Sequence, residues 1–64
     1  MYKYKYFGKV VAETDNDRYI EIEVDGDEIS IGVDTPMNYE SISLTQEEAV
    51  SFLEMLSEAV KALE

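Results

Sequence analysis

Carboxylates are the only residues in this chain that could do acid–base chemistry, because the sequence has fifteen Asp and Glu residues but no His and no Cys. Without His no side chain ordinarily titrates near neutral pH, and without Cys there is no thiolate nucleophile. A working pair of carboxylates would need one member buried in a cleft, and a domain of 64 residues has little room for a cleft. The sequence therefore predicts a protein that is not an enzyme, with no catalytic residues and no cofactor.

Two acidic clusters, Asp15-Asn16-Asp17 and Asp25-Gly26-Asp27-Glu28, gather oxygen atoms that could bind a divalent cation. An EF-hand loop needs Gly at its sixth position and Glu at its twelfth. Counted from Asp15, these positions hold Ile20 and Gly26, so the pattern fails. The same residue types are favoured in turns for their backbone geometry. We therefore predict turns and no metal site, and leave weak cation binding to these loops open.

Aromatic and basic residues alternate near the N-terminus, a pattern that could bind single-stranded nucleic acid by stacking rings on bases and placing lysines on phosphates. The residues are Tyr2, Tyr4, Tyr6 and Phe7 with Lys3, Lys5 and Lys9. The alternative is a first strand whose tyrosines point into the core and whose lysines face Glu21 and Glu23 on the next strand. The net charge of −10 favours this alternative, because an acidic protein repels phosphate backbones.

Negative charge is concentrated after the first strand. From Ala12 onward fifteen acids stand against Arg18 and Lys61, a balance of −13. Several of these acids fall at outward strand positions or in the connecting turns, so they would form a negative band down one face of a sheet. We predict that this band and a neighbouring aromatic residue bind a partner, through Asp15, Asp17, Tyr19, Glu21, Glu23, Asp25, Asp27, Glu28 and Asp34.

One amphipathic helix is predicted over residues 46–63. Thr45 and Glu48 have the spacing of a capping box, and Glu47 adds a further negative charge to the first turn. The apolar residues that follow recur at intervals of three and four, on one side of a helix. We call them the helix stripe: Ala49, Phe52, Leu53, Leu56, Ala59, Val60 and Leu63. Such a stripe must be covered, and within the chain a sheet is the candidate.

Four strands are predicted before the helix, at residues 2–12, 18–24, 28–34 and 40–44. Alternating apolar residues flank the hairpin signal Asp25-Gly26, and Gly8 is typical of a β-bulge. Short connections between sequential strands favour an antiparallel meander. The predicted fold is one two-layer α+β domain over residues 1–64, a four-stranded antiparallel β-meander with a C-terminal helix packed on one face, in the order ββββα.

These features give one main functional hypothesis, a small acidic inhibitor that binds a basic protein surface of a nucleic-acid-handling complex by electrostatic complementarity. A phage-type anti-CRISPR or other anti-defence protein that mimics nucleic acid is its concrete form. The alternative is a homo-oligomeric structural or interaction domain whose charge serves solubility.

The length of the chain and its apolar content bear on its oligomeric state and its location in the cell. A chain this short buries only ~60% of its unfolded surface, so homodimerisation is left open. No apolar run approaches the ~20 residues that span a bilayer, and no signal-peptide pattern is present. We therefore expect a cytoplasmic protein with no membrane contact and no direct contact with nucleic acid.

Overall fold

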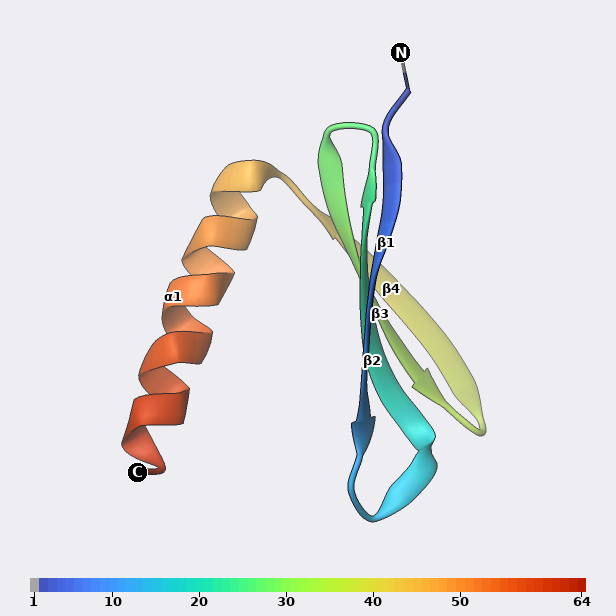
Figure 1. Cartoon of the computed structure of the whole chain (residues 1–64), viewed down its shortest axis with the longest axis vertical. Coiled ribbons are helices and arrows are strands. Elements are labelled where there is room, and N and C mark those ends of the chain that lie inside the picture. Colours follow the sequence, from blue (N-terminus) through green and yellow to red (C-terminus); the bar gives the residue numbers. More distant parts are fainter. Residues whose placement is uncertain (1) are drawn as a thin grey trace.

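The computed structural model describes residues 2–64 as four antiparallel strands followed by one helix (Figure 1). The elements are β1 (Tyr4–Ala12), β2 (Asp15–Asp25), β3 (Glu28–Thr35), β4 (Asn38–Leu44) and α1 (Gln46–Ala62). The strands pair in the order β1-β2-β3-β4 in one open sheet. The predicted antiparallel meander and the ββββα order are confirmed.

Strands β2 and β4 are longer than predicted because two connections are tight turns. The predicted strands leave residues 13–17 as a turn, but β2 already begins at Asp15. They also leave residues 35–39 as a loop, whereas Thr35 pairs directly with Asn38 in the β3–β4 ladder. The Asn38 backbone N–H donates to the Thr35 hydroxyl at 3.1 Å, which closes this turn.

The register of the strands gives the sheet two faces of different composition. Residues directly opposite each other on antiparallel strands share a face. One face, which we call the aliphatic face, carries the aliphatic residues Val10, Ile20, Ile22, Val24, Ile29, Ile31, Val33, Ile42 and Leu44. The other, which we call the tyrosine–carboxylate face, carries Tyr4, Tyr6, Tyr19, Tyr39, Glu21, Glu23, Asp25, Glu28 and Asp34.

A β-bulge in β1 reverses the predicted direction of the first tyrosines. The pairing of β1 with β2 shifts by one residue between Tyr6 and Gly8, so Phe7 is an extra residue. Gly8 has a φ of +135°, a backbone conformation that residues other than glycine rarely adopt. The extra residue changes the alternation, so Tyr4 and Tyr6 lie on the opposite face from Val10. The prediction that these tyrosines form a core beneath the helix is therefore wrong.

The same bulge places the two lysines of β1 on opposite faces of the sheet. Lys9 lies opposite Glu21, as predicted, on the tyrosine–carboxylate face. Lys5 lies opposite Val24 on the aliphatic face, and its ammonium is 5.0 Å from the centre of the Phe7 ring. The predicted pairing of lysines with carboxylates is therefore correct after the bulge and wrong before it.

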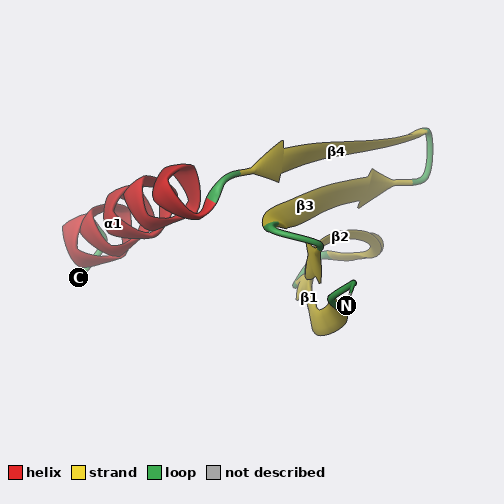
Figure 2. Cartoon of the chain, turned by 90° about the horizontal axis from the view of Figure 1, so that it is seen from above, coloured by secondary structure: helices red, strands yellow, loops and turns green. Residues whose placement is uncertain are grey.

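Helix α1 is present where predicted, but it does not lie over the sheet of its own chain. Figures 1 and 2 both show it standing to one side of the sheet, and Thr45 alone joins it to β4. Every helical residue except Ala49 is exposed, including Leu53 at 61% and Leu56 at 50%. No hydrophobic side chain in residues 2–64 is buried. The chain therefore has the predicted strands and helix, but the predicted packing of the helix on the sheet is absent from residues 2–64.

The predicted capping box fixes the start of α1. The Glu48 N–H donates to Thr45 Oγ1 at 3.2 Å, and the Thr45 N–H donates to Glu48 Oε1 at 2.9 Å. We expect Thr45→Ala to lower the free energy of unfolding by about 1 kcal/mol in urea denaturation. Thr45→Ser keeps the hydroxyl and should change it much less. Equal stability of the wild type and Thr45→Ala would show that the cap contributes nothing.

Candidate protein-binding face

Phenol-to-carboxylate hydrogen bonds hold the tyrosine–carboxylate face in place. The Tyr4 hydroxyl on β1 donates to Glu23 Oε2 on β2 at 2.6 Å. The Tyr19 hydroxyl on β2 donates to Asp34 Oδ2 on β3 at 2.8 Å. Such charge-assisted bonds are stronger than neutral ones. They restrict these two carboxylates, so this part of the face is a preorganised anionic surface.

Gly32 on β3 allows Tyr39 to lie close to the centre of this face. Gly32 is the one buried residue of the described chain. A Cβ at this position would lie 2.8 Å from the Tyr39 hydroxyl oxygen and 3.2 Å from Glu21 Cγ. These separations are shorter than an ordinary van der Waals contact. The glycine therefore lets Tyr39 of β4 approach Glu21 of β2 across the intervening strand.

One side-chain cation already lies against an aromatic ring on this face. The Lys9 ammonium is 4.6 Å from the centre of the Tyr19 ring, within the ~6 Å range of cation–π attraction. An arginine guanidinium suits the same surroundings, because it stacks on aromatic rings and donates forked hydrogen bonds to carboxylates. The face therefore has the chemistry to bind arginine and lysine side chains.

The carboxylates also raise the pKa values of the tyrosines. The hydrogen bond to Asp34, assisted by partial removal from water, raises the pKa of Tyr19 to about 12. The hydrogen bond to Glu23 likewise raises the pKa of Tyr4. Partial removal from water is the larger cause of the raised pKa of Tyr6, and the Glu21 carboxylate on β2 is the next. Phenols are protonated at neutral pH at their ordinary pKa of 10.0, and these raised pKa values keep the three phenols hydrogen-bond donors further into the alkaline range.

We expect Asp34→Asn to lower the pKa of Tyr19 from about 12 towards the ordinary value of 10.0, because it removes the charged acceptor. A titration of tyrosinate ultraviolet absorbance measures this change. Asp27→Asn in the β2–β3 turn is the control with the same change of charge. An unaltered Tyr19 titration in Asp34→Asn would contradict the assignment of Asp34 as the cause.

Because the pKa of Tyr19 is raised in the folded chain, the stability of the fold should decrease at alkaline pH. Between pH 10.0 and about 12 the folded chain keeps a proton that the unfolded chain has lost. This contribution to stability is therefore complete below the unfolded pKa and disappears as the pH rises through the folded pKa. Wild-type stability should fall over this alkaline range, and it should fall less steeply in Asp34→Asn.

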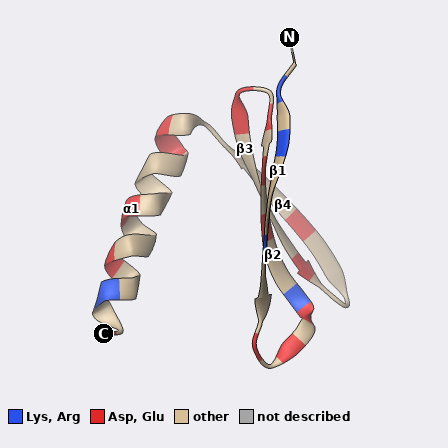
Figure 3. Ribbon diagram, viewed as in Figure 1, with Lys and Arg blue, Asp and Glu red and all other residues tan. Residues whose placement is uncertain are grey.

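The structure brings most of the predicted partner-binding residues onto one face: Tyr19, Glu21, Glu23, Asp25, Glu28 and Asp34. Asp27 lies in the β2–β3 turn, and Asp15 and Asp17 lie at the start of β2. Asp15 Oδ2 pairs there with Arg18 Nε at 3.2 Å. Figure 3 shows the acidic residues spread over β2, β3, β4 and α1, whereas the charged residues of β1 are all basic.

Three tyrosines of the face were not among the predicted binding residues. Strict alternation along the first strand predicts that Tyr4 and Tyr6 point into the core, and the extra residue at Phe7 places them on the other face. Tyr39 lies in the predicted loop, but Pro36 and Met37 form a two-residue turn that places it on β4, opposite Asp34. The sequence features that place these tyrosines are therefore the bulge at Gly8 and the Pro36-Met37 turn.

A cluster of metal ligands and a helix able to span a membrane are both absent from the part of the chain that the structure describes. No three acidic, His or Cys residues in it are grouped to hold a metal ion. No helix within residues 2–64 combines the length and apolar character needed to cross a bilayer. No known protein family, curated protein or solved structure matches the sequence or the fold. The functional interpretation therefore depends on the geometry of the sheet.

Proposed function

We propose that this chain is a small, non-enzymatic inhibitor whose tyrosine–carboxylate face occupies a basic surface of another protein. The observation that best supports this proposal is the Lys9 ammonium 4.6 Å from the Tyr19 ring, on a face rich in carboxylates. Arginines of a partner can use the same chemistry, stacking on the rings and donating to Glu21 and Glu23. Opposite charge accelerates the encounter, and the rings supply apolar contact area.

The target that we favour is a nucleic-acid-handling protein in the cytoplasm of a bacterial cell. A groove that binds nucleic acid is lined with basic residues that attract phosphates. Glu21 and Glu23 are two residues apart on one strand, which separates their Cα atoms by about 7 Å. Carboxylates at this spacing can occupy phosphate positions along such a groove. A phage-type anti-CRISPR or other anti-defence protein is the concrete form of this function.

Direct binding of single-stranded nucleic acid is less favoured, because carboxylates share the face with the tyrosine rings. Tyr6 lies opposite Glu23, and the Tyr4 hydroxyl is hydrogen-bonded to the same carboxylate. A base stacked on either ring would bring its phosphate close to Glu23. The net charge of −10 adds a long-range repulsion.

Capture from a bacterial lysate on the immobilised wild-type chain, at low and at high salt, tests this proposal. We expect a basic nucleic-acid-binding protein to be retained at low salt and released at high salt, because exposed charges are screened. The purified partner should then lose its nucleic acid when this chain is added. A partner that keeps its nucleic acid, or one retained equally at both salt concentrations, would overturn the proposal. The alternative, a homo-oligomeric interaction domain without nucleic-acid mimicry, predicts no such capture.

A further inference from the structure

We infer that α1 of a second copy covers the aliphatic face, so that the protein is a helix-exchanged homodimer. Two apolar surfaces are left open in a single copy, the aliphatic face and the helix stripe. Ile42 on the face is 58% exposed, and Phe52 on the stripe is 42% exposed. Sheets with a hydrophobic face need that face covered to be stable in water. Each copy offers the surface that the other lacks.

The exposed area of one copy is too large for a complete monomer. The chain exposes 5609 Å², whereas a compact monomer of 7.3 kDa should expose about 4,200 Å². Its radius of gyration is 13.2 Å, against about 10.7 Å for a compact domain of this length. The excess of about 1,400 Å² per copy, or about 2,800 Å² for two copies, falls within the range of obligate homodimer interfaces.

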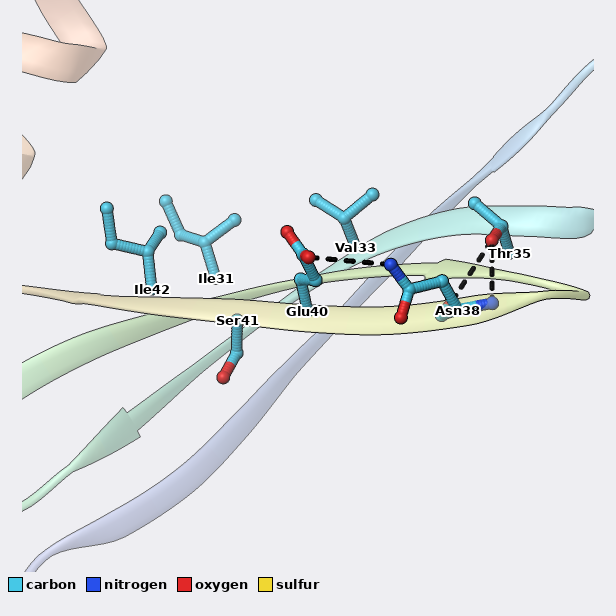
Figure 4. Close-up of a pocket in the computed structure, with 7 residues that line it drawn as sticks. All are labelled: Ile31, Val33, Thr35, Asn38, Glu40, Ser41 and Ile42. Carbon is cyan, nitrogen blue, oxygen red and sulfur yellow. Dashed lines mark hydrogen bonds between the residues drawn. The ribbon is translucent and has the colours of Figure 1, made fainter.

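The helix and the aliphatic face also match in length and shape. The 17 residues of α1 make a helix about 26 Å long. The eight residues of β3 extend about 27 Å. Figure 4 shows Ile31, Val33 and Ile42 projecting from the same side of the sheet, where they help to line a shallow hollow of about 280 Å³. Large side chains of the stripe can fill this hollow.

The connection between β4 and α1 favours a second copy over the chain's own helix. The only linking residue, Thr45, has an extended backbone, and both hydrogen bonds of its capping box are formed. The helix is thus held away from the sheet of its own chain (Figure 2). Reciprocal exchange about a two-fold axis covers both apolar surfaces of both copies at once.

The charges of the chain do not oppose this arrangement. The helix carboxylates Glu54 and Glu58 lie outside the stripe by helical periodicity. Each tyrosine–carboxylate face is on the side of the sheet turned away from the interface.

Two charged residues lie on the aliphatic face, both on edge strands: Lys5 on β1, opposite Val24, and Glu40 on β4, opposite Val33. Glu40 also lines the hollow beside Ile31 and Val33. Both side chains are exposed and long enough to keep their charged ends in water. The exchange therefore buries aliphatic surface and leaves the acidic faces outside.

Single cysteines test which copy supplies the helix, because the chain has no native Cys. Chains carrying Leu53→Cys, Leu56→Cys or Val60→Cys would each be mixed with chains carrying Ile31→Cys and treated with a short thiol cross-linker. We expect cross-linked heterodimers of a helix chain and a sheet chain. The control pair, Ser51→Cys with Ser30→Cys, lies on the same two elements but on the polar side of α1 and on the tyrosine–carboxylate face of the sheet, and should cross-link at least tenfold less.

Cross-links only between like chains, or none above the control in any of the three mixtures, would overturn the exchange. If the cysteine variants do not fold, an isotope-filtered NMR experiment on mixed labelled and unlabelled wild-type protein replaces them. It should show methyl contacts between isoleucines of one copy and leucines of the other. Contacts that occur only within a copy would equally overturn the inference.

Discussion

Replacing Leu56 with aspartate is expected to separate the two copies and to unfold the chain at concentrations where the wild type is folded. Leu56 lies in the middle of the helix stripe and is 50% exposed in one copy. Exchange would bury it against the aliphatic face of the partner. The substitution removes this apolar burial and places a carboxylate in the interface, which should cost about 3 kcal/mol or more. Urea denaturation and light scattering measure the two effects.

The control for this substitution is Ser51→Asp, which adds the same charge on the polar side of the helix. It should change the free energy of unfolding by no more than about 0.5 kcal/mol. The wild-type melting temperature should also rise with protein concentration, as it does when folding and association are linked. If Leu56→Asp kept the wild-type mass and stability, the stripe would not be part of an interface.

Neutralising four carboxylates of the tyrosine–carboxylate face is expected to weaken binding to the captured partner by at least about 100-fold. The variant combines Glu21→Gln, Glu23→Gln, Asp25→Asn and Glu28→Gln, and changes the net charge from −10 to −6. A hydrogen bond to a charged group contributes about 1.5–3 kcal/mol. Since 1.4 kcal/mol is a factor of ten in affinity, the loss of two such bonds produces the expected change. Titration calorimetry against the purified partner measures it.

The matched control instead neutralises three carboxylates of α1 and the one that follows it: Glu47→Gln, Glu54→Gln, Glu58→Gln and Glu64→Gln. Its net charge is also −6, and the capping residue Glu48 is kept. We expect this control to bind nearly as well as the wild type at physiological salt. Equal weakening by both variants would mean that only net charge matters, and no weakening by either would exclude the face as the site.

The Leu56→Asp substitution and the four-carboxylate variant test the dimer interface and the partner-binding face independently. The four carboxylates lie on the opposite side of the sheet from the aliphatic face. The face variant should therefore remain a dimer while it loses the partner. A dimer also presents two tyrosine–carboxylate faces, so it can bind two basic surfaces at once and gain from multivalency.

The secondary structure could be predicted because its signals are local. The capping box at Thr45 and Glu48 marks the helix start, and both of its hydrogen bonds are present. Apolar alternation on either side of Asp25-Gly26 predicts the hairpin of β2 and β3, which the register confirms. The carboxylates on that hairpin share a face for the same reason. Periodicity and turn chemistry act within a few residues, so one sequence is enough to predict them.

The direction of the tyrosines and the place of the helix could not be predicted from the same signals. One extra residue at Phe7 moves Tyr4 and Tyr6 to the other face, and alternation alone does not show where a bulge falls. The stripe of α1 shows that the helix must be covered, but periodicity is the same whether the covering sheet belongs to its own chain or to another copy. Such features depend on contacts that are distant in sequence.

The molar mass of the wild-type protein in solution tests most directly whether a second copy completes its core. Light scattering over a range of micromolar concentrations should give twice the chain mass of 7.3 kDa, with helix and sheet both present by circular dichroism. Dissociation at the lowest concentrations should be accompanied by loss of structure, since one copy leaves its apolar surfaces in water. A stable, folded monomer of 7.3 kDa throughout this range would contradict the helix-exchanged dimer.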